Sequence, residues 1–259
     1  MRKLLLLLVA WPLLAATIYN GQTFIIPFDK TYKTFMTHTT VGNLLIIPIP
    51  YDAKPTTRWL RIDGKAVRLV IKRKRYPKAR LRVAPSKVHP PKSAQKRIAA
   101  EYKEAKKIYA HVTPKSFITR PFALPLYSEI TDPFGTARIF NGSLASYHSG
   151  TDFRARIGTP VRAVNDGKVV LAKKRYYAGG SVIIDHGRGI YSCYYHLSRF
   201  KARPGEVVKR GEVIALSGKS GRVTGPHLHL SFKVRGITVD PLQFIEAFNR
   251  AFRTVSSLQ

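Results

Sequence analysis

Cysteine is almost absent from this chain of 259 residues. Cys193 is the single cysteine, so no disulfide can form within the chain. It lies in an apolar, aromatic run, and a free cysteine usually behaves as a small hydrophobic residue, so we expect a buried strand position rather than a nucleophile. The sequence also has no evident internal repeat and no low-complexity linker.

Acidic residues are scarce as well. The 14 aspartates and glutamates stand against 45 lysines and arginines, which gives a formal net charge of +31. Such an excess favours contact with a polyanion, namely nucleic acid, an acidic membrane face or an acidic wall polymer. The basic run Lys72-Arg73-Lys74-Arg75 is short, and no aromatic platform of the kind that single-strand binders use surrounds it. We therefore expect no nucleic-acid partner and an electrostatic attraction to an anionic wall or membrane surface.

The chain lacks an apolar run of the length that an ordinary spanning helix needs. Met1-Arg2-Lys3 precedes the apolar stretch Leu4 to Ile18, which falls short of the required ~20 residues and is interrupted by Pro12. A charged start followed by a short apolar stretch is typical of a secretory signal. We expect residues 1–17 to lie outside the folded body and to direct export to the periplasm or cell envelope. Cleavage and retention as a membrane anchor both stay open.

What is present predicts a mainly β protein in two parts. Over residues 18–90, short alternating runs are separated by turn residues, which predicts a small β-sandwich-like N-terminal domain. Residues 91–117 contain a helix-forming stretch, interpreted as a connecting helix that packs one domain against the other. Residues 118–259 contain short, glycine-rich strands and an amphipathic end, which predict an antiparallel β-sheet domain with a C-terminal helix.

Two histidines, His227 and His229, open an alternating stretch near the end of the chain. On a strand, residues i and i+2 point to the same face, ~6–7 Å apart. Two solvated strand histidines would have the same spacing, but another pair of metal-binding residue types lies upstream in His148-Ser149-Gly150-Thr151-Asp152. A hydrolytic zinc site takes three protein ligands and leaves one position open for water, and His148, Asp152 and His229 would supply three.

Three motifs in this order resemble the lysostaphin-type (LytM-like) zinc metallopeptidases, which cut peptide bonds in bacterial peptidoglycan. They are His-x-Gly-x-Asp at 148–152, Tyr-x-His-Leu at 194–197 and Gly-Pro-His-Leu-His at 225–229. The resemblance extends over about half of the chain, from Ile118 to Leu242. It implies an antiparallel, groove-lined fold, one zinc ion per chain and peptidoglycan as the substrate and partner.

By motif position, the resemblance implies that His148, Asp152 and His229 hold the zinc ion. It implies that His196 and His227 form the catalytic pair that stays off the metal, and imidazole suits proton handling because its unperturbed pKa is ~6.5. The expected activity is that of a peptidoglycan endopeptidase, with carboxypeptidase action left open. The alternative is a non-catalytic wall-binding activator of another hydrolase, but such proteins typically lack a ligand and this chain lacks none.

Three weaker candidates could border the groove, namely Asn141, Tyr147 and Tyr195. Asn141 equally suits a turn, and the two tyrosines could line the groove or simply fill it. His186 is expected to end a strand at a turn rather than to bind zinc. The bond that is cut and the oligomeric state stay open.

Overall fold

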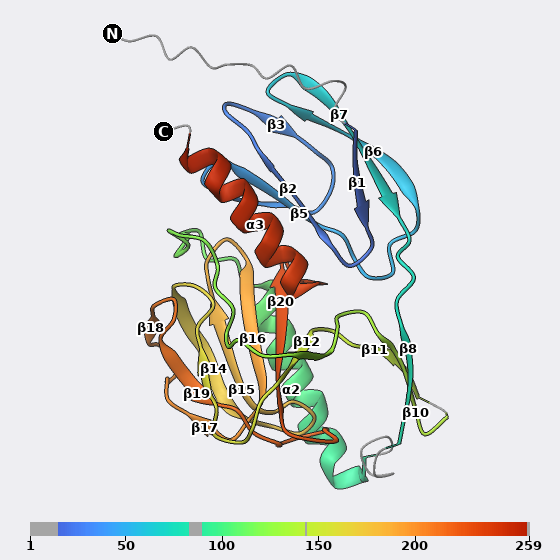
Figure 1. The fold of residues 1–259 in the computed structure, drawn as a ribbon, viewed down its shortest axis with the longest axis vertical. Helices are drawn as coiled ribbons and strands as arrows, with labels where there is room; N and C mark the ends of the chain where they lie inside the picture. The colour runs from blue at the N-terminus through green and yellow to red at the C-terminus, as the bar shows by residue number, and fades with distance from the viewer. Residues whose placement is uncertain (1–14, 83–89, 143, 258–259) are drawn as a thin grey trace.

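The computed structural model describes residues 15–82, 90–142 and 144–257. Figure 1 shows two β-rich parts with the C-terminal helix, α3, between them. The expected mainly β fold built on antiparallel sheets is confirmed. Residues 1–14, most of the expected export segment, lie outside the described residues. Among those that are described, no helix has both the length and the apolar character needed to cross a membrane.

The N-terminal part is a small sandwich of two sheets, as its alternating sequence predicts. Ile18, Leu45 and Leu69 come from different strands of the two sheets and belong to one buried core. In spatial order, the first sheet contains β1 (Ala15–Tyr19), β7 (Lys65–Lys72), β6 (Thr56–Ile62) and β3 (Tyr32–Lys33), and the second contains β2 (Thr23–Pro27), β5 (Leu44–Pro48) and β4 (Thr39–Val41).

Strand β1 begins earlier than expected. Ala15, Ala16 and Thr17 pair in parallel with residues 68–70 of β7. The last three residues of the expected export segment therefore belong to the folded sheet, which corrects the boundary at residue 17. Strand pairing uses backbone groups, so small side chains that suit a cleavage site also suit a strand.

The C-terminal part is built on one large sheet whose neighbouring strands all pair antiparallel. A smaller sheet packs beside it, and both contribute to the main buried core. The large sheet contains, in order, β18 (Val207–Val208), β14 (Gly167–Arg175), β15 (Gly179–Asp185), β16 (Ile190–Leu197), β20 (His227–Val234), β12 (Thr151–Arg154) and β9 (Ile130–Asp132), with β21 (Ile237–Val239) paired to β20; the smaller contains β13 (Pro160–Arg162), β19 (Val213–Leu216) and β17 (Arg199–Phe200).

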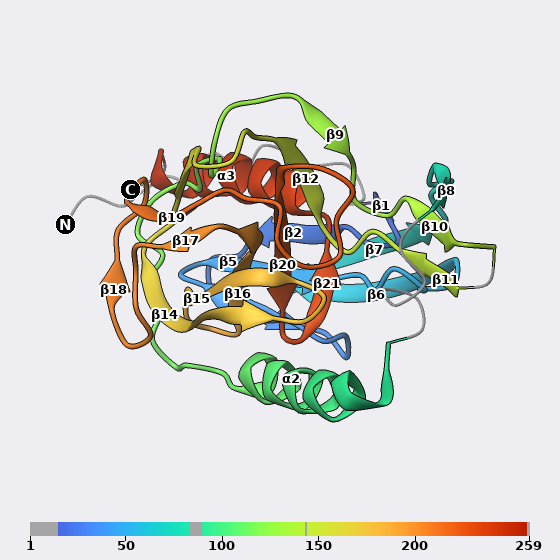
Figure 2. The ribbon, with the colours of Figure 1, turned by 90° about the horizontal axis from the view of Figure 1, so that it is seen from below.

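Helix α2 (Lys92–Ala110) packs on the large sheet rather than between the two parts. Figure 2 shows it running along the sheet on the side away from α3. Ile108 and Tyr109 pack against the buried cluster that contains Tyr191 and Cys193. Cys193 is thus the buried strand residue that its apolar neighbours predict. The expectation that this helix packs one domain against the other is wrong, because its apolar residues meet the sheet of its own C-terminal part.

The two parts are instead joined by helix α3 (Pro241–Ser256) and strand β5. The backbone N–H of Thr23 in β2 donates to Gln243 Oε1 at 2.7 Å, and Gln243 Nε2 donates back to the Thr23 carbonyl at 3.0 Å. Strand β5 is buried on both faces: Leu45 faces the N-terminal core, while Ile46 belongs to the main core of the C-terminal part. The two cores are therefore separated only by the thickness of one sheet.

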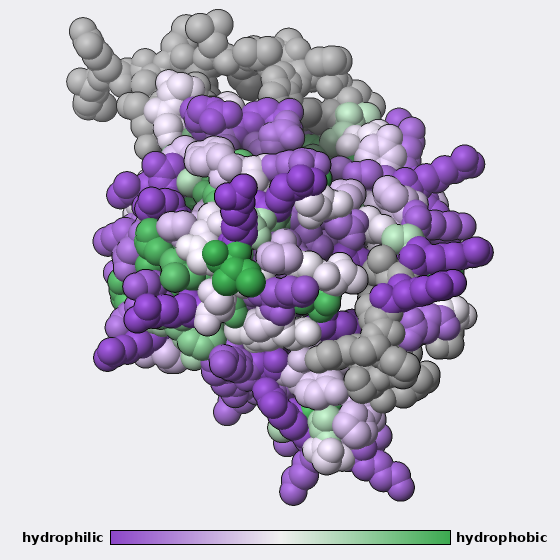
Figure 3. Space-filling view, turned by 60° about the horizontal axis from the view of Figure 1, so that its bottom comes forward, coloured by the Kyte–Doolittle hydropathy of each residue, from purple (hydrophilic) through white to green (hydrophobic). Residues whose placement is uncertain are grey.

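A third contact between the parts lies beside the large sheet. Strand β8 (Lys78–Leu81) pairs in parallel with β10 (Ala137–Phe140), which forms a hairpin with β11 (Leu144–Tyr147). Figure 2 places this three-stranded sheet at the end of the molecule away from β14 and β18. The space-filling view in Figure 3 shows hydrophilic side chains projecting over much of the face that it presents. A strand from the N-terminal sequence thus reaches the edge of the C-terminal part.

Candidate active site

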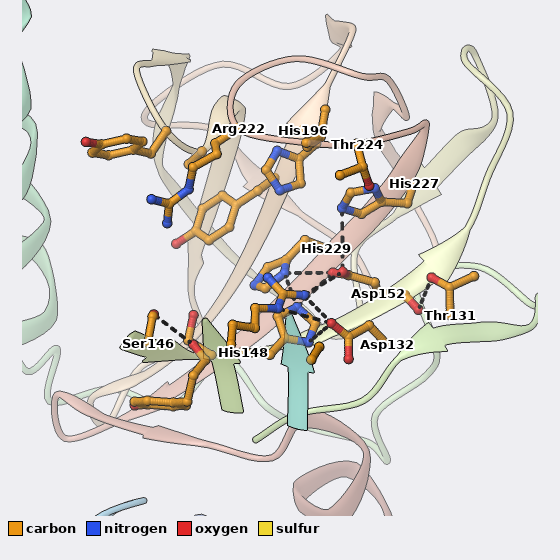
Figure 4. Close-up of a pocket in the computed structure, with 18 residues that line it drawn as sticks. Thr131, Asp132, Ser146, His148, Asp152, His196, Arg222, Thr224, His227 and His229 are labelled. Carbon is orange, nitrogen blue, oxygen red and sulfur yellow. Dashed lines mark hydrogen bonds and ion pairs between the residues drawn. The ribbon is translucent and has the colours of Figure 1, made fainter. Parts of the chain in front are cut away.

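The five histidine and aspartate residues expected at the site all lie beside one cleft of the C-terminal part. Strand β12 pairs with β20 so that Asp152 is opposite His229, and Asp152 and His229 point to the same face. The core face of the same two strands carries Phe153, Leu228 and Leu230, which are fully or almost fully buried. The strict alternation of these strands therefore separates the polar site from the apolar core. Figure 4 shows the polar side chains converging.

Three of these side chains bring their polar atoms into contact. His148 Nε2 lies 3.0 Å from Asp152 Oδ1 and 2.9 Å from His229 Nδ1. His229 Nδ1 lies 2.8 Å from the same Asp152 oxygen. All three residues are buried. Two imidazole nitrogens and a carboxylate oxygen thus form a small triangle at the bottom of the cleft.

His148 is oriented by the loop between β9 and β10. Its Nδ1 lies 2.9 Å from the carbonyl oxygen of Pro133, which can only accept, so Nδ1 carries the proton and Nε2 presents a lone pair to the triangle. The His148 backbone exchanges hydrogen bonds with this loop, donating to the Thr136 carbonyl at 2.9 Å and accepting from Gly135 N–H at 2.8 Å. The loop therefore selects both the position and the tautomer of this ring.

The close packing around residue 150 explains why the first motif has glycine between its histidine and its aspartate. A Cβ atom at this position would lie 2.2 Å from the Leu230 carbonyl oxygen and 2.4 Å from His229 Nε2. Contacts under 3.0 Å are essentially never made by real Cβ atoms. The backbone of residue 150 can approach the His229 ring only because glycine lacks a Cβ atom.

His196 and His227 lie above the triangle and do not belong to it (Figure 4). Their ring centroids are 4.8 Å apart. His196 Nδ1 donates to the Ser220 carbonyl at 2.9 Å, and His227 Nδ1 donates to the Gly225 carbonyl at 2.9 Å. Because both carbonyls can only accept, the Nε2 atom of each neutral ring holds a lone pair. His227 Nε2 lies 3.7 Å from Asp152 Oδ2.

Burial and hydrogen bonding set the charges at the site. Burial alone would raise the pKa of Asp152, but its short polar contacts with the imidazoles of His148 and His229 outweigh burial, so the pKa lies well below its ordinary value and the carboxylate is ionised. Burial, followed by the neighbouring His229 and His227, lowers the pKa of His196 to about 3. Burial also lowers the pKa of His229 to about 4. Both rings are therefore neutral at pH 7, as metal ligation or proton acceptance requires.

The weaker candidates differ in where they lie. Tyr195 stacks on the His229 ring, with centroids 5.4 Å apart and planes at 18°. Tyr147 also lines the cleft, and its ring stacks at 3.8 Å on Tyr51 of the N-terminal part. Asn141 is an exposed residue with φ of 48° at the turn between β10 and β11, and it is not among the residues that line the cleft. Asn141 thus has the geometry of a turn asparagine.

His186 lies outside the site, as expected. It is completely buried, with Nδ1 2.7 Å from the Asp166 carbonyl and Nε2 2.8 Å from Ser192 Oγ. Both ring nitrogens therefore have partners in the protein.

Two charged residues at the site were not expected from the sequence. Arg138 of β10 makes ion pairs with Asp132 and, at 3.3 Å, with Asp152 Oδ2. Asp132 Oδ2 in turn lies 3.5 Å from His148 Nδ1. In the sequence, Asp132-Pro133 has the pattern of a turn. Arg138 has no sequence feature that distinguishes it from the many other basic residues. Only the pairing of β10 and the course of the loop bring them to the site.

The residues present fit a zinc ion. Zinc in hydrolytic sites takes histidine nitrogen and carboxylate oxygen at about 2.0–2.2 Å and keeps one position open. His148, Asp152 and His229 offer one ligand atom each, all within 4.8 Å of one another. The His148 hydrogen bond at Nδ1 leaves Nε2 facing the triangle, the His229 ring is neutral and Asp152 is ionised, which suits metal ligation.

Comparison with known proteins agrees with this site. A family model described as peptidase family M23 matches residues 146–241. Over 96 residues, the chain is 48% identical to the peptidoglycan DD-endopeptidase ShyA of Vibrio cholerae, covering 37% of this chain and 22% of that protein. It is 38% identical over 117 residues to the DD-carboxypeptidase/endopeptidase Mpg of Neisseria meningitidis, covering 45% of this chain and 27% of that protein. The chain thus spans only about a quarter or less of the length of these relatives.

One solved structure matches almost the whole chain. It is a Pseudomonas aeruginosa protein described as a candidate M23 peptidase, with a TM-score of 0.67 and 25% identity, and the match covers 89% of this chain and 95% of that one. The likeness therefore includes the N-terminal sandwich as well as the matched domain. Together with the matched motifs, it shows that the chain carries a domain of peptidase family M23, in agreement with its resemblance to the lysostaphin-type zinc metallopeptidases.

Proposed function

We propose that this protein is a zinc-dependent peptidase that hydrolyses peptide bonds in the stem peptides or cross-links of peptidoglycan. The observation that carries the proposal is the triangle of His148 Nε2, Asp152 Oδ1 and His229 Nδ1 at the bottom of an open cleft. The named activities of the Vibrio and Neisseria relatives support the substrate class. A non-catalytic activator would leave this complete set of ligands without a use.

In the proposed reaction, these three atoms would hold one zinc ion per chain. When bound, it supplies Lewis acidity, which activates water and polarises a carbonyl group. Arg138 contacts the second oxygen of Asp152 and so orients the first toward the ligating position. Tyr195 stacks on the His229 ring and limits its rotation. These contacts hold the donors in place before substrate arrives, so little reorganisation is needed.

His196 and His227 are proposed to handle protons at Nε2. Each ring is held by an Nδ1–H bond to a backbone carbonyl, so Nε2 can accept a proton from water and later donate it to the departing amine. The φ of 65° at His196 supports a functional constraint on this residue, because such a conformation is uncommon outside glycine and has an energetic cost. Its backbone N–H donates to the Ala178 carbonyl at 2.9 Å, which fixes the strained residue.

The setting of the enzyme is proposed from its sequence and architecture. Residues 1–14 would direct export to the periplasm or envelope, and the excess of positive charge would concentrate the protein on an anionic wall or membrane surface. We further propose that the N-terminal β-domain, up to about residue 90, gates or positions substrate rather than performing chemistry. Its supporting contacts are Ala79 of β8, which lines the cleft, and the stack of Tyr51 on Tyr147.

The test measures zinc content and cleavage of defined muropeptides on the same preparations. His229→Ala should lose metal and activity together, because two protein ligands rarely replace three. His227→Ala and His196→Ala should keep metal while activity falls by ~10²–10⁴-fold, the usual cost of removing one acid–base group. His111→Ala is a matched control at an exposed histidine and should change neither.

If His227→Ala lost zinc and His229→Ala kept it, His227 would be the metal ligand and His229 the proton-handling residue. Full activity in all three site variants would refute the zinc-peptidase function itself. Mass analysis of the muropeptide fragments then identifies the bond that is cut and separates endopeptidase from carboxypeptidase action.

A further inference from the structure

The cleft does not end at the metal site. Strand β20 presents His227, His229, Ser231 and Lys233 in a row on one face, because alternate residues of a strand point the same way. Beyond His229, this face lines a second cavity of about 620 Å³, which shares Ser149 and Tyr195 with the cleft. At ~3.3 Å per residue, Lys233 lies ~13 Å along the strand from His229.

Helix α2 forms the other wall of this second cavity, which we call the α2 cavity. Tyr102, Lys106 and Tyr109 of α2 face β20 across it. The Tyr109 hydroxyl lies 3.1 Å from that of Tyr195, which connects the wall to the aromatic ring that stacks on His229. The α2 residues precede the segment 146–241 that matches the family model. This wall therefore comes from sequence outside the matched domain.

The charged residues that line the α2 cavity are all basic. They are Lys106, Arg175, Lys233 and Arg235, and no acidic residue is among the described residues of the lining. Two glutamates of α2 lie outside this lining. Glu101 pairs with Arg97 at 2.8 Å, and Glu104 pairs through Oε1 with Lys173 at 2.7 Å while its buried Oε2 has no hydrogen-bond partner among the described residues. The cavity therefore has a strong positive potential that no neighbouring carboxylate of its lining reduces.

Lys233 is the most informative of these cations. Its ammonium group contacts the Thr238 hydroxyl and lies 5.2 Å from the centre of the Tyr109 ring. Within the described part of the chain, it forms no ion pair with a carboxylate. Burial lowers its pKa, so the charge is held at a cost in this position. A charge in a partly buried cavity without an anionic partner is unfavourable unless a ligand provides one.

Arg175 gives a second, independent indication. Its Nη2 donates to the Glu101 carbonyl at 3.1 Å, which anchors the guanidinium against α2. Its Nε is buried, and no hydrogen-bond partner reaches it among the described residues. Buried nitrogens of this kind are normally paired. Arg175 and Lys233 both line the α2 cavity, and guanidinium and ammonium groups are suited to an oxygen of a carboxylate.

We propose that the α2 cavity binds a carboxylate of the peptide substrate and so holds one end of that peptide about four extended residues from the hydrolysed bond. The proposal rests on the peptidase function proposed above. Lys233 would make the charge-assisted hydrogen bond, Arg175 and Lys106 would add positive charge, and the exposed Tyr102 ring would contact apolar parts of the peptide. Residues of α2 would thus help the enzyme to distinguish one peptide substrate from another.

The test uses the full, zinc-loaded protein and two synthetic cross-linked peptides that differ only in their carboxyl groups. In one, the side-chain and terminal carboxyls are free, and in its twin they are amidated. Wild type should have a lower KM for the acidic peptide. Lys233→Met keeps the bulk of the side chain but removes the charge, and should raise KM for the acidic peptide by ~10–100-fold with little change for the amidated one. Lys233→Arg should restore most of the preference.

Lys168→Met is the matched control, since Lys168 is exposed and lines neither cavity. It should leave the acidic preference unchanged, whereas a general effect of net charge would reduce it too. Equal KM values for the two peptides with wild type, or a Lys233→Met effect that is the same for both, would overturn the carboxylate site while leaving the peptidase function intact. Hydrolysis of neither peptide by wild type would count against the peptidase function. Binding of the acidic peptide to the His196→Ala variant, with and without Lys233→Met, would then decide the carboxylate site by calorimetry.

Discussion

Replacing Gly150 with alanine tests how closely the backbone must approach the zinc-binding triangle. The added Cβ atom would lie 2.4 Å from His229 Nε2 and 2.2 Å from the Leu230 carbonyl oxygen, whereas ordinary contacts begin at 3.4 Å. For the distance between His229 Nε2 and the added Cβ atom to reach 3.4 Å, the His229 ring must move by about 1 Å. Zinc–ligand distances in well-formed sites vary by only about 0.2 Å. Gly150→Ala should therefore displace His229 Nδ1 from the ligating position.

Two effects are expected from this change, and they can be measured separately. Zinc affinity should fall by at least the ~10–100-fold that is typical when groups supporting a metal ligand are lost. The free energy of unfolding of the metal-free protein should fall by about 1–3 kcal/mol, the usual cost of overpacking a buried position. Competition with a chelator of known affinity reports the first quantity, and denaturant titration of the metal-free protein reports the second.

Gly225→Ala is the matched control. This glycine is also in a motif, but an added Cβ atom meets nothing within 4 Å and its backbone is not in the left-handed region. It should retain zinc and unfold like wild type. If Gly150→Ala bound zinc with unchanged affinity, the close approach of residue 150 to His229 would not be what positions the ligand, and the reasoning would fail.

Three further predictions concern export, surface charge and acid stability. Residues 1–17 fused to a reporter that is active only outside the cytoplasm should give a signal, and silence would contradict export. Binding to isolated sacculi should weaken sharply as salt rises, since the Debye length is ~8 Å at 0.15 M; salt-independent sedimentation would indicate a specific pocket instead. Burial lowers the pKa of His186 to about 4 from 6.5, so as pH falls the unfolded chain binds a proton first and stability decreases through this range. The free energy of unfolding, measured by denaturant titration, should fall by about 3 kcal/mol between neutral pH and pH 4. His186→Gln should lose less over the same pH range, and an equal loss in the two proteins would refute the role of His186.

The N-terminal part directly contacts the loop and the hairpin that border the site. Tyr51 stacks on Tyr147, and its hydroxyl donates to the Gly135 carbonyl at 3.1 Å. Both contacts are on the loop and hairpin that carry His148 and Arg138. The N-terminal sandwich is thus placed to support the metal site through packing, without contributing a ligand.

The sequence by itself determined the strand that carries the site and the residues that converge there. Alternation places His227 and His229 on one face of β20 with Leu228 on the other, because the side-chain period of a strand is two residues wherever the strand lies. The short spacing from His148 to Asp152 likewise keeps these two donors near each other. Such local rules need no knowledge of the rest of the chain.

Tertiary structure alone decided which other groups surround these residues. Arg138 reaches Asp152 because β10 pairs with β8 and β11 next to the site, and the α2 cavity exists because α2 packs on the large sheet rather than between the two parts. These neighbours are distant in sequence, and one amphipathic helix or one arginine among many basic residues gives no local signal of its partner. The physical reason is that packing partners are chosen by the complementary shapes and apolar faces of whole elements, which a pattern within a single element does not specify.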